Sequence, residues 1–369
     1  MTSQSKTIPS LYGIRAISIL LVVVSHCFLR TRGEGRAEKI LLALAGNGTV
    51  GVSIFFVVSG FLITLLLLKE RSHAGSVDLR DFYLRRVFRI LPAFLIYIAV
   101  IAVLTLAGSL SVPWQQFWRA LTFTMDYVPE KNWFLGHVWS LSVEEQFYLL
   151  WPLLLVLCSR RLLTVITGGI IVLGPLIRML DRVVLPGTRS EIEYMGHTRL
   201  DMLMFGCLIA LYFEEDWLRA LLAKTNALAV PALSAVFLFL ISPLIEMRFG
   251  GVYIKTFGYS LQGMTISFMM LYLITRPESL PGKVFNSRLV VHLGAISYSL
   301  YLWQELFIGF REFSVTITAI RVAAAFLLAE ISYYFVEAPM LRMKRRVAGA
   351  QSAVLRFGRS ISEQTLADS

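Results

Sequence analysis

Apolar blocks of about 20 residues recur along this chain and constrain its fold more than any other feature. Examples are LYGIRAISILLVVVSHCFL (11–29), VGVSIFFVVSGFLITLLLL (50–68) and ILPAFLIYIAVIAVLTLAGSL (90–110). Each has the length of about 20 residues that a helix needs to cross a bilayer. Hydrophobic residues make up 56% of the chain and charged residues 16%, whereas soluble domains have about 45–50% and about 25%. These features exclude a soluble globular fold and predict an all-α, polytopic integral membrane protein.

Seven further blocks complete the pattern, so we expect about ten transmembrane helices. They fall at about 139–157, 162–180, 198–213, 226–244, 252–274, 288–310 and 315–336. The sixth span is short and the ninth carries polar residues, which makes these two the weakest. Lysine and arginine are about twice as frequent in the segments on the side of the amino terminus, and the positive-inside rule therefore places both termini in the cytoplasm.

The organisation is expected to be simple, with one membrane domain over residues 1–346 and a polar cytoplasmic tail over 347–369. The first block contains Arg15 and lacks a small-residue cleavage site after it, so it is interpreted as a permanent span and not as a signal peptide. The net charge of +11 fits cytoplasmic loops of a membrane protein and not a nucleic-acid partner. The three cysteines have no metal-ligand spacing, so no metal site is predicted.

Ionisable residues inside the spans are the candidates for function, because they are costly there. They are Arg15, His26, Glu144, Glu145, Arg199, Asp201, Glu330 and Glu337. Arg15 and His26 are eleven residues apart, which puts them on one helix face at depths that differ by about 16 Å. This suits an elongated ligand with an anionic head near Arg15 and a reactive end near His26. Alternatively, Arg15 extends to the lipid headgroups and His26 hydrogen-bonds within the bundle.

A cluster of arginines offers a second anion-binding feature. In YLRRVFRILP, Arg86 and Arg89 are spaced i, i+3 and Arg85 and Arg89 are spaced i, i+4, so these arginines are expected to project together at the start of a helix, just before Pro92. Guanidinium groups at a helix amino terminus form a natural phosphate site. The alternative is ordinary anchoring of a positive segment at the bilayer edge.

On the outer side, Glu144 lies about 7 Å below Trp139 along its helix, at a depth that matches His26. A carboxylate that contacts an imidazole makes it a usable general base. Alternatively, this glutamate faces water at an interfacial turn. Arg199 and Asp201 open the sixth span at the same face and either bind a polar acceptor or pair with each other.

Other features are less specific or point away from familiar classes. His137 lies at the outer boundary of a span, where a solvated histidine is commonplace. The sequence has neither a Walker P-loop nor a G-x-S-x-G elbow, so it does not predict ATP-driven pumping or serine-hydrolase chemistry.

Seven motifs in a fixed order point to one family. In chain order they are Arg15 with His26, FFVVSGF with Ser59 and Gly60, Arg86 with Arg89, WSLSVEEQFYLLWP with Trp139 and Glu144, Arg199 with Asp201, LGAISYSLYLWQ with Tyr298 and Trp303, and FVEAP with Glu337. Over residues 8–345 this set resembles the membrane acyltransferase-3 family, bacterial O-acyltransferases of surface glycans and some secreted small molecules. One position departs, since the family often has histidine where this chain has Gln304.

The resemblance implies an enzyme of the bacterial inner membrane with no permanently bound cofactor. Its co-substrate would be cytoplasmic acyl-coenzyme A, acetyl by default, and its acceptor a hydroxyl at the outer face, often on a sugar. The other expected partners are membrane lipids and a separate periplasmic acyltransferase. The runner-up hypothesis is a secondary transporter or flippase for a sugar, lipid or acyl compound, with His26 and Glu144 as a proton relay.

The resemblance also distributes roles among the motif residues. The donor phosphates would bind Arg15, Arg86 and Arg89. His26, oriented by Glu144, would deprotonate the acceptor hydroxyl or become acylated itself. Contacts to the acceptor are expected from Arg199, Asp201, Tyr298, Trp303 and Gln304, and structural roles from Ser59, Gly60, Trp139 and Glu337.

Overall fold

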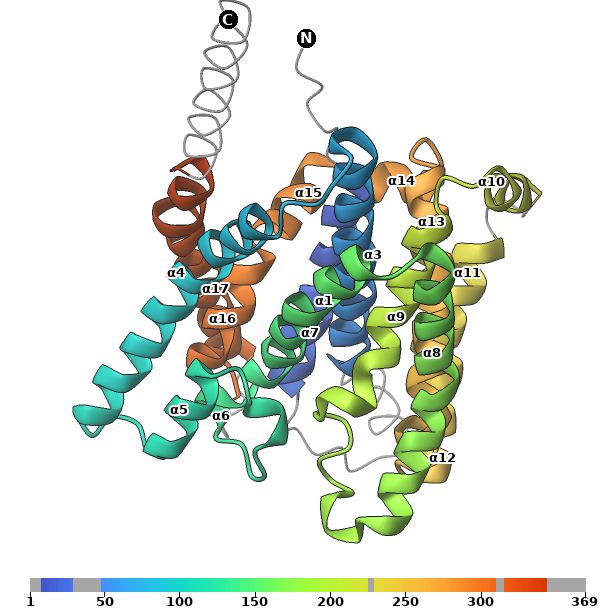
Figure 1. The fold of residues 1–369 in the computed structure, drawn as a ribbon. Coiled ribbons are helices and arrows are strands. Elements are labelled where there is room, and N and C mark those ends of the chain that lie inside the picture. Colours follow the sequence, from blue (N-terminus) through green and yellow to red (C-terminus); the bar gives the residue numbers. More distant parts are fainter. Residues whose placement is uncertain (1–7, 29–47, 225–228, 310–314, 344–369) are drawn as a thin grey trace, which may run out of the picture.

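The computed structural model describes residues 8–28, 48–224, 229–309 and 315–343. Within these ranges the regular structure is entirely helical and contains no strand. Figure 1 shows the helices packed side by side, with the start of α1 (Pro9–Phe28) and the last described residues, which follow α17 (Val315–Ser332), at the same end of the bundle. The predicted tail 347–369 and the predicted domain boundary at 346 lie outside the described residues.

Within the described ranges, eight helical segments are long and apolar enough to cross a membrane. They are α1, α3 (Gly48–Ala74), α4 (Leu79–Leu106), α6 with α7 (Trp133–Gly136 and Val138–Leu157), α8 (Arg160–Val184), α11 with α12 (Ala229–Val236 and Ser242–Phe249), α13 (Tyr259–Thr275) and α17. The π-helical turns η3 (Phe237–Ile241), η4 (Ile254–Gly258) and η5 (Tyr333–Glu337) join or extend three of them. All eight coincide with predicted spans, so the polytopic helical architecture is confirmed.

The other two predicted spans take a different form. The sixth is α9 (Gly196–Tyr212), which has only 17 residues. The ninth is divided into α15 (Arg288–Ala295) and α16 (Ser297–Phe307), which meet at Ile296. These are the two blocks that were weakest in the sequence, and neither forms one long apolar helix.

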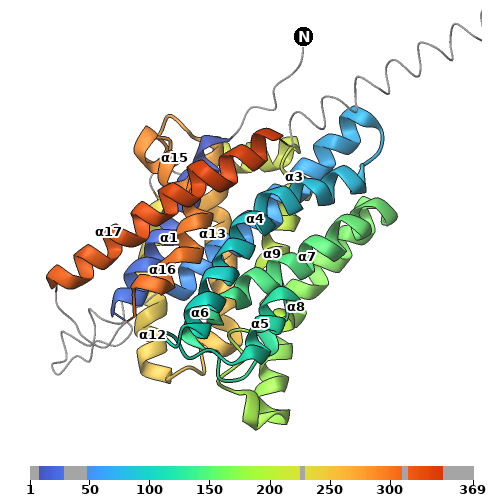
Figure 2. The same cartoon turned by 90° about the vertical axis from the view of Figure 1, so that its left-hand side faces the viewer.

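Shorter helices connect the long ones. They are α5 (Trp114–Leu121), α10 (Asp216–Ala223), α14 (Leu280–Phe285) and the single turns η1 (Met125–Tyr127) and η2 (Pro186–Thr188). Figures 1 and 2 show α5 and α6 near the end of the bundle opposite to the start of α1. Helix α5 leaves Trp114 and Trp118 exposed, which is typical of a helix at a membrane–water interface.

Helix α3 lies at the centre and is the most buried of the eight long segments, with 78% of its most apolar window inside the structure. Two glycines allow α9 to pack directly against it. A Cβ at Gly60 would overlap the carbonyl oxygen of Leu203, and a Cβ at Gly206 would overlap that of Val57. Small residues of this kind let helix backbones approach closely in membranes, and here they hold the middle of α9 against α3.

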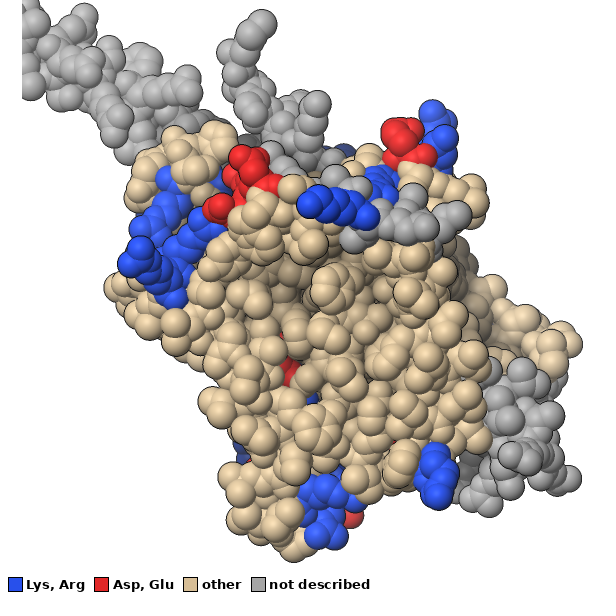
Figure 3. Space-filling model, turned by 90° about the vertical axis from the view of Figure 1, so that its right-hand side faces the viewer, with Lys and Arg blue, Asp and Glu red and all other residues tan. Residues whose placement is uncertain are grey.

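The outer surface is apolar where lipid would contact it. Helix α8 and the segment that begins with α17 have only 22% and 17% of their apolar windows buried. Their exposed side chains include Val165, Val172, Leu180 and Leu327. Figure 3 shows charged side chains gathered at the two ends of the molecule and an almost uncharged surface between them. This distribution is that of a multi-pass membrane protein.

Candidate active site

Two of the cavities among the described helices share Tyr301 as a lining residue. The arginine cavity, of about 70 Å³, lies toward the end at which α1 begins. Its polar lining residues include Arg15, Ser59, Arg86, Arg89, Glu144 and Tyr298. The histidine cavity, of about 480 Å³, lies toward the end at which α1 ends. Its lining includes His26, Lys131, His137, Glu193, Arg199 and Glu305.

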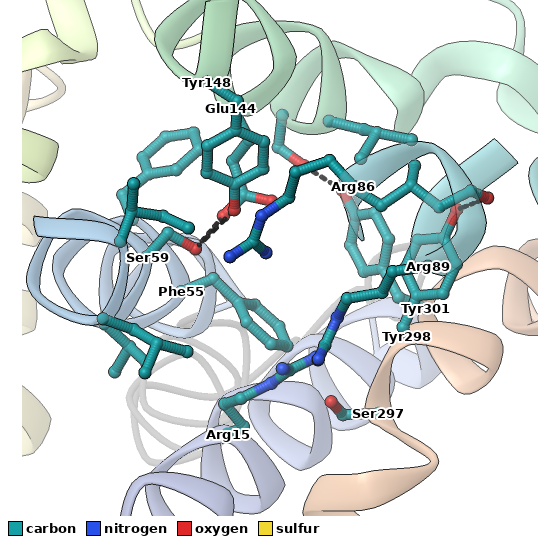
Figure 4. A pocket seen from close by; sticks show the side chains of 17 residues that line it. Arg15, Phe55, Ser59, Arg86, Arg89, Glu144, Tyr148, Ser297, Tyr298 and Tyr301 are labelled. Atoms are coloured by element: carbon teal, nitrogen blue, oxygen red, sulfur yellow. Dashed lines mark hydrogen bonds between the residues drawn. The ribbon is translucent and has the colours of Figure 1, made fainter. Parts of the chain in front are cut away.

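The structure brings together the three arginines that the sequence assigned to one ligand. Arg15 projects from α1 and Arg86 and Arg89 from α4 into the same space (Figure 4). Arg85, the neighbour of Arg86, instead forms ion pairs with Glu70 and Asp81 and does not line the cavity. Helical spacing alone does not explain the difference, because positions 85 and 89 are spaced i, i+4 and also share a face. The ion pairs with Glu70 and Asp81 hold Arg85 away from the cavity, so the expectation that it projects together with Arg89 is wrong.

Aromatic rings hold two of these guanidinium groups in place. Arg15 lies over the ring of Phe55, with 5.9 Å between its Cζ and the ring centroid, and Arg86 lies 5.0 Å over Tyr148. Within the described residues, the buried Nε atoms of Arg15 and Arg86 have no hydrogen-bond partner. Unpaired donors of fixed charge are what a multiply charged anion such as a phosphate requires.

Glu144 belongs to the arginine cavity, and its predicted contact with His26 is wrong. Ser59 Oγ donates a hydrogen bond to Glu144 Oε1 at 2.5 Å, and the Tyr148 hydroxyl donates to Ser59 Oγ at 3.1 Å. Glu144 lies six residues inside α7, about 9 Å from its start. The depth estimate failed because it assumed a relative register of the two helices, whereas this carboxylate meets Ser59 of α3 and lines a different cavity from His26.

His26 is held by α16 and α6 instead. Its Nδ1 lies 2.8 Å from Oε1 of Gln304 and 3.8 Å from Oε1 of Glu305. The Trp133 ring packs edge-on against the imidazole, with centroids 5.2 Å apart. In the tautomer with the proton on Nδ1, this nitrogen donates to the Gln304 oxygen and Nε2 keeps its lone pair.

For two residues that line this cavity the sequence analysis fell short, because it missed Glu305 and misjudged His137. Glu305 is buried, and its Oε2 lies 2.7 Å from Nδ1 of His137. His137 is also buried, at 4% exposure, so the expectation that it is solvated is wrong. Glu305 lies inside the ninth apolar block, and the rule that singles out ionisable residues within spans applies to it as well. The described residues hold no group of three or more His, Cys, Asp or Glu side chains that is suited to a metal ion.

Residues 8–336 match the model of the family Acyl_transf_3, an acyltransferase domain. The chain belongs to this acyltransferase family. It is similar to "Putative O-acetyltransferase SACOL0978" of Staphylococcus aureus (strain COL), with 28% identity over 366 residues that cover 91% of this chain and 58% of that protein. It is also similar to O-acetyltransferase OatA of Staphylococcus aureus (strain NCTC 8325 / PS 47), with 28% identity over 373 residues that cover 90% of this chain and 57% of OatA.

The chain spans less than two thirds of the length of these curated relatives. No solved structure matches the chain. The predicted resemblance to the acyltransferase-3 family is confirmed, and the remaining motif residues can be placed in its fold.

Arg199 and Asp201 do not pair with each other, contrary to one of the two hypotheses. Arg199 lines the histidine cavity, donates to Ser53 Oγ at 3.0 Å and lies 3.8 Å over the ring of Tyr259. Asp201 lines neither cavity. Its two oxygens accept hydrogen bonds from the buried Arg178, at 3.1 and 2.9 Å. The predicted contact of Asp201 with an acceptor therefore has no support in the geometry.

Of the other acceptor candidates, which all lie on α16, Tyr298 alone lines one of the two cavities. Tyr298 lines the arginine cavity and donates to the Ile90 carbonyl at 2.8 Å. Gln304 supports His26 directly. Trp303 lines neither cavity and packs edge-on against Tyr97, with centroids 5.3 Å apart. Of the expected acceptor contacts on α16, none has its side chain among the residues that line the histidine cavity.

The residues expected to be structural lie at helix contacts and at a cavity wall. Trp139 lines the histidine cavity and packs edge-on against Tyr194, with centroids 5.2 Å apart. Glu337 is buried in the π-helical turn η5 and accepts a short hydrogen bond from Ser299 on α16. This bond ties α16 to the end of the segment that begins with α17.

Proposed function

We propose that this protein is a membrane O-acyltransferase that moves an acyl group, most simply acetyl, from cytoplasmic acyl-coenzyme A to a hydroxyl of a glycan. The transfer would take place at the outer face of the bacterial inner membrane. One observation carries the proposal: a cavity lined by three arginines and a cavity lined by an imidazole lie in one bundle and share Tyr301 as a lining residue. Family membership and the names of the two relatives support O-acetylation as the reaction.

In this proposal the arginine cavity binds the donor. Arg15, Arg86 and Arg89 offer charged N–H groups to the phosphates of coenzyme A, and the unpaired Nε atoms of Arg15 and Arg86 favour an anionic ligand. The pantetheine arm then follows α1 from Arg15 to His26, a rise of about 16 Å over eleven residues. The thioester carbon would thus reach the histidine cavity while the nucleotide stays at the arginines.

The histidine cavity binds the acceptor. Its volume of about 480 Å³ falls within the range of about 300–1,000 Å³ of small-molecule sites. Arg199 and the aromatic side chains of Trp139 and Tyr194 line it. Apolar ring faces beside charged donors suit a sugar, which has both apolar ring edges and hydroxyl groups. A separate periplasmic acyltransferase is a proposed partner that would carry the product group further.

His26 supplies the chemistry through Nε2. In one route Nε2 takes the proton of the acceptor hydroxyl while its oxygen attacks the thioester carbon. In the other, Nε2 attacks that carbon first and an acyl-histidine passes the group to the hydroxyl. In both routes the C–S bond breaks, the coenzyme leaves as a thiolate that takes up a proton, and the ring carries a positive charge along the way.

Topology supports the same assignment of sides. We propose that the end at which α1 begins faces the cytoplasm, because the segments at that end carry about twice as many lysines and arginines as those at the other. Both termini are then cytoplasmic. The arginine cavity lies toward the pool of acyl-coenzyme A, and the histidine cavity lies toward the periplasm.

Purified protein in detergent, mixed with radiolabelled acetyl-coenzyme A, tests the proposal. We expect saturable binding and release of free coenzyme A that increases when an N-acetylglucosamine oligosaccharide is added. Protein that binds no coenzyme A derivative contradicts the proposal and favours the transporter or flippase hypothesis. That hypothesis predicts solute flux into vesicles that depends on a proton gradient and not on coenzyme A.

A further inference from the structure

The carboxylate of Glu305 lies between two imidazoles in the histidine cavity. Its Oε2 is 2.7 Å from Nδ1 of His137, and its Oε1 is 3.8 Å from Nδ1 of His26. The side chain of Glu305 is only 4% exposed. A buried carboxylate is costly unless partners compensate it, so its place beside two histidines calls for a functional explanation.

Contacts on both sides hold the backbone that carries this carboxylate and the histidine that it meets. Trp133 Nε1 donates to the backbone carbonyls of Glu305 and Ile308, at 2.9 and 3.1 Å, and thereby holds the end of α16. The ring of the same tryptophan packs against His26. On the other side, the His137 ring packs edge-on against Tyr97 and Tyr301, with centroids 5.4 and 5.3 Å apart.

Gln304 and Glu305 can divide the support of His26 between them. The Gln304 amide oxygen fixes which nitrogen carries the proton, but an amide has no charge with which to stabilise a positive ring. A carboxylate 3.8 Å away supplies that charge, and its effect is large in a water-poor interior. An oriented, charge-compensated imidazole is what general-base or nucleophilic catalysis needs.

We propose that Glu305 is a positioning residue for His26, held by His137, and that its charge stabilises the positively charged ring during acyl transfer. This rests on the proposed function of His26. The proton moves from the acceptor hydroxyl to His26 Nε2, the O–C bond forms, the C–S bond breaks, and the departing thiolate takes the proton from the ring. Glu305 stays ionised throughout and exchanges no proton.

Glu305→Gln is the sharpest test, because it removes the charge and retains the shape. We expect kcat for acetyl-coenzyme A cleavage to fall about 100-fold, with KM for the donor changed less than about two-fold because the arginine cavity is untouched. Glu305→Asp, which keeps the charge, should recover much of the lost kcat. The matched control is Glu330→Gln, which neutralises a carboxylate 2.7 Å from His292 Nε2 at a site that lines neither cavity. It should keep wild-type kcat.

His137 provides a second pair of variants. An asparagine at 137 can place its amide N–H where Nδ1 now lies and continue to donate to Glu305, whereas a leucine cannot. We therefore expect His137→Asn to retain much of kcat and His137→Leu to lose it as Glu305→Gln does. Equal thermal unfolding midpoints in detergent establish that each variant is folded.

The outcomes distinguish the role of Glu305 from the acyltransferase function on which it rests. Wild-type kcat in a folded Glu305→Gln variant overturns the role of Glu305 and leaves the acyltransferase proposal intact. If Glu305→Gln lowers activity by raising KM, the role of Glu305 is also overturned, because the residue then acts through binding. Wild-type protein that cleaves no acetyl-coenzyme A overturns both proposals together.

Discussion

The arginine cavity and the histidine cavity differ in how their residues reach one another. Arg86 and Arg89 are neighbours on a single helix, so their spacing in the sequence already determines that they project together. His26, His137 and Glu305 come from different segments and meet only through packing. The comparison teaches that binding groups within one helix are visible in a sequence, whereas a site shared by several helices depends on their relative depths.

Replacement of His26 should give the largest effect and the clearest separation of the two cavities. His26→Ala removes the group that we propose to be the base or nucleophile, so kcat should fall about 10³-fold or more. Binding of acetyl-coenzyme A, measured by equilibrium dialysis, should stay within about two-fold of wild type. Full transfer by a folded His26→Ala variant contradicts both chemical routes.

Asp201 tests whether the histidine cavity depends on a structural ion pair beside it. Asp201→Asn leaves the buried Arg178 without its charged partner, a change that typically costs about 3–5 kcal/mol. We expect a large decrease in the thermal unfolding midpoint in detergent. The double variant Arg178→Met with Asp201→Leu should recover most of it. A stable Asp201→Asn protein with a raised KM for the acceptor would return Asp201 to the binding role.

The arginine cavity should respond in the opposite way to His26. Arg86→Gln combined with Arg89→Gln removes two charged donors, each worth about 1.5–3 kcal/mol in a hydrogen bond. We expect KM or Kd for acetyl-coenzyme A to rise about 100-fold, with a smaller change in kcat. Arg85→Gln is the matched control, because Arg85 pairs with Glu70 and Asp81 outside the cavity. Equal losses from the control and the double variant would point to anchoring at the membrane surface.

Gln304 should give the smallest of these effects. Gln304→Leu removes the oxygen that fixes the His26 proton on Nδ1 but keeps the charge of Glu305, so we expect kcat to fall about ten-fold. Gln304→His introduces the residue that the family often has at this position and should retain more activity than the leucine variant. A Gln304→Leu enzyme with unchanged kcat would show that Glu305 suffices to orient the ring.

Hydropathy predicted most of the fold because eight spans are continuous apolar helices. Hydropathy could not show that the ninth block breaks at Ile296. Close to this break the block packs against α1 through Gly294, where a Cβ would overlap the backbone of Tyr12. Only the folded chain reveals this contact. The relative register of α1 and α7 was equally hidden, which is why Glu144 was placed beside His26.

The buried charged residues show the same limit of sequence-based prediction. Arg178 and Glu305 both lie in predicted spans, and a stricter count of ionisable residues in apolar blocks includes them. Their partners, Asp201 and His137, could not be assigned from the sequence. Arg178 and Asp201 lie on the consecutive helices α8 and α9, whereas His137 and Glu305 are 168 residues apart in the chain.

Tyr301 has a consequence for the membrane as an electrical barrier. Its ring lines both cavities, and its hydroxyl donates to the His137 carbonyl at 2.7 Å and lies 2.5 Å from Ser140 Oγ. With the two cavities open to opposite faces, as proposed, the membrane potential falls mainly across this thin wall. Each elementary charge that crosses it gains or loses about 2.3 kcal/mol per 100 mV. The packing of Tyr301 then helps to prevent protons from leaking across the membrane through this protein.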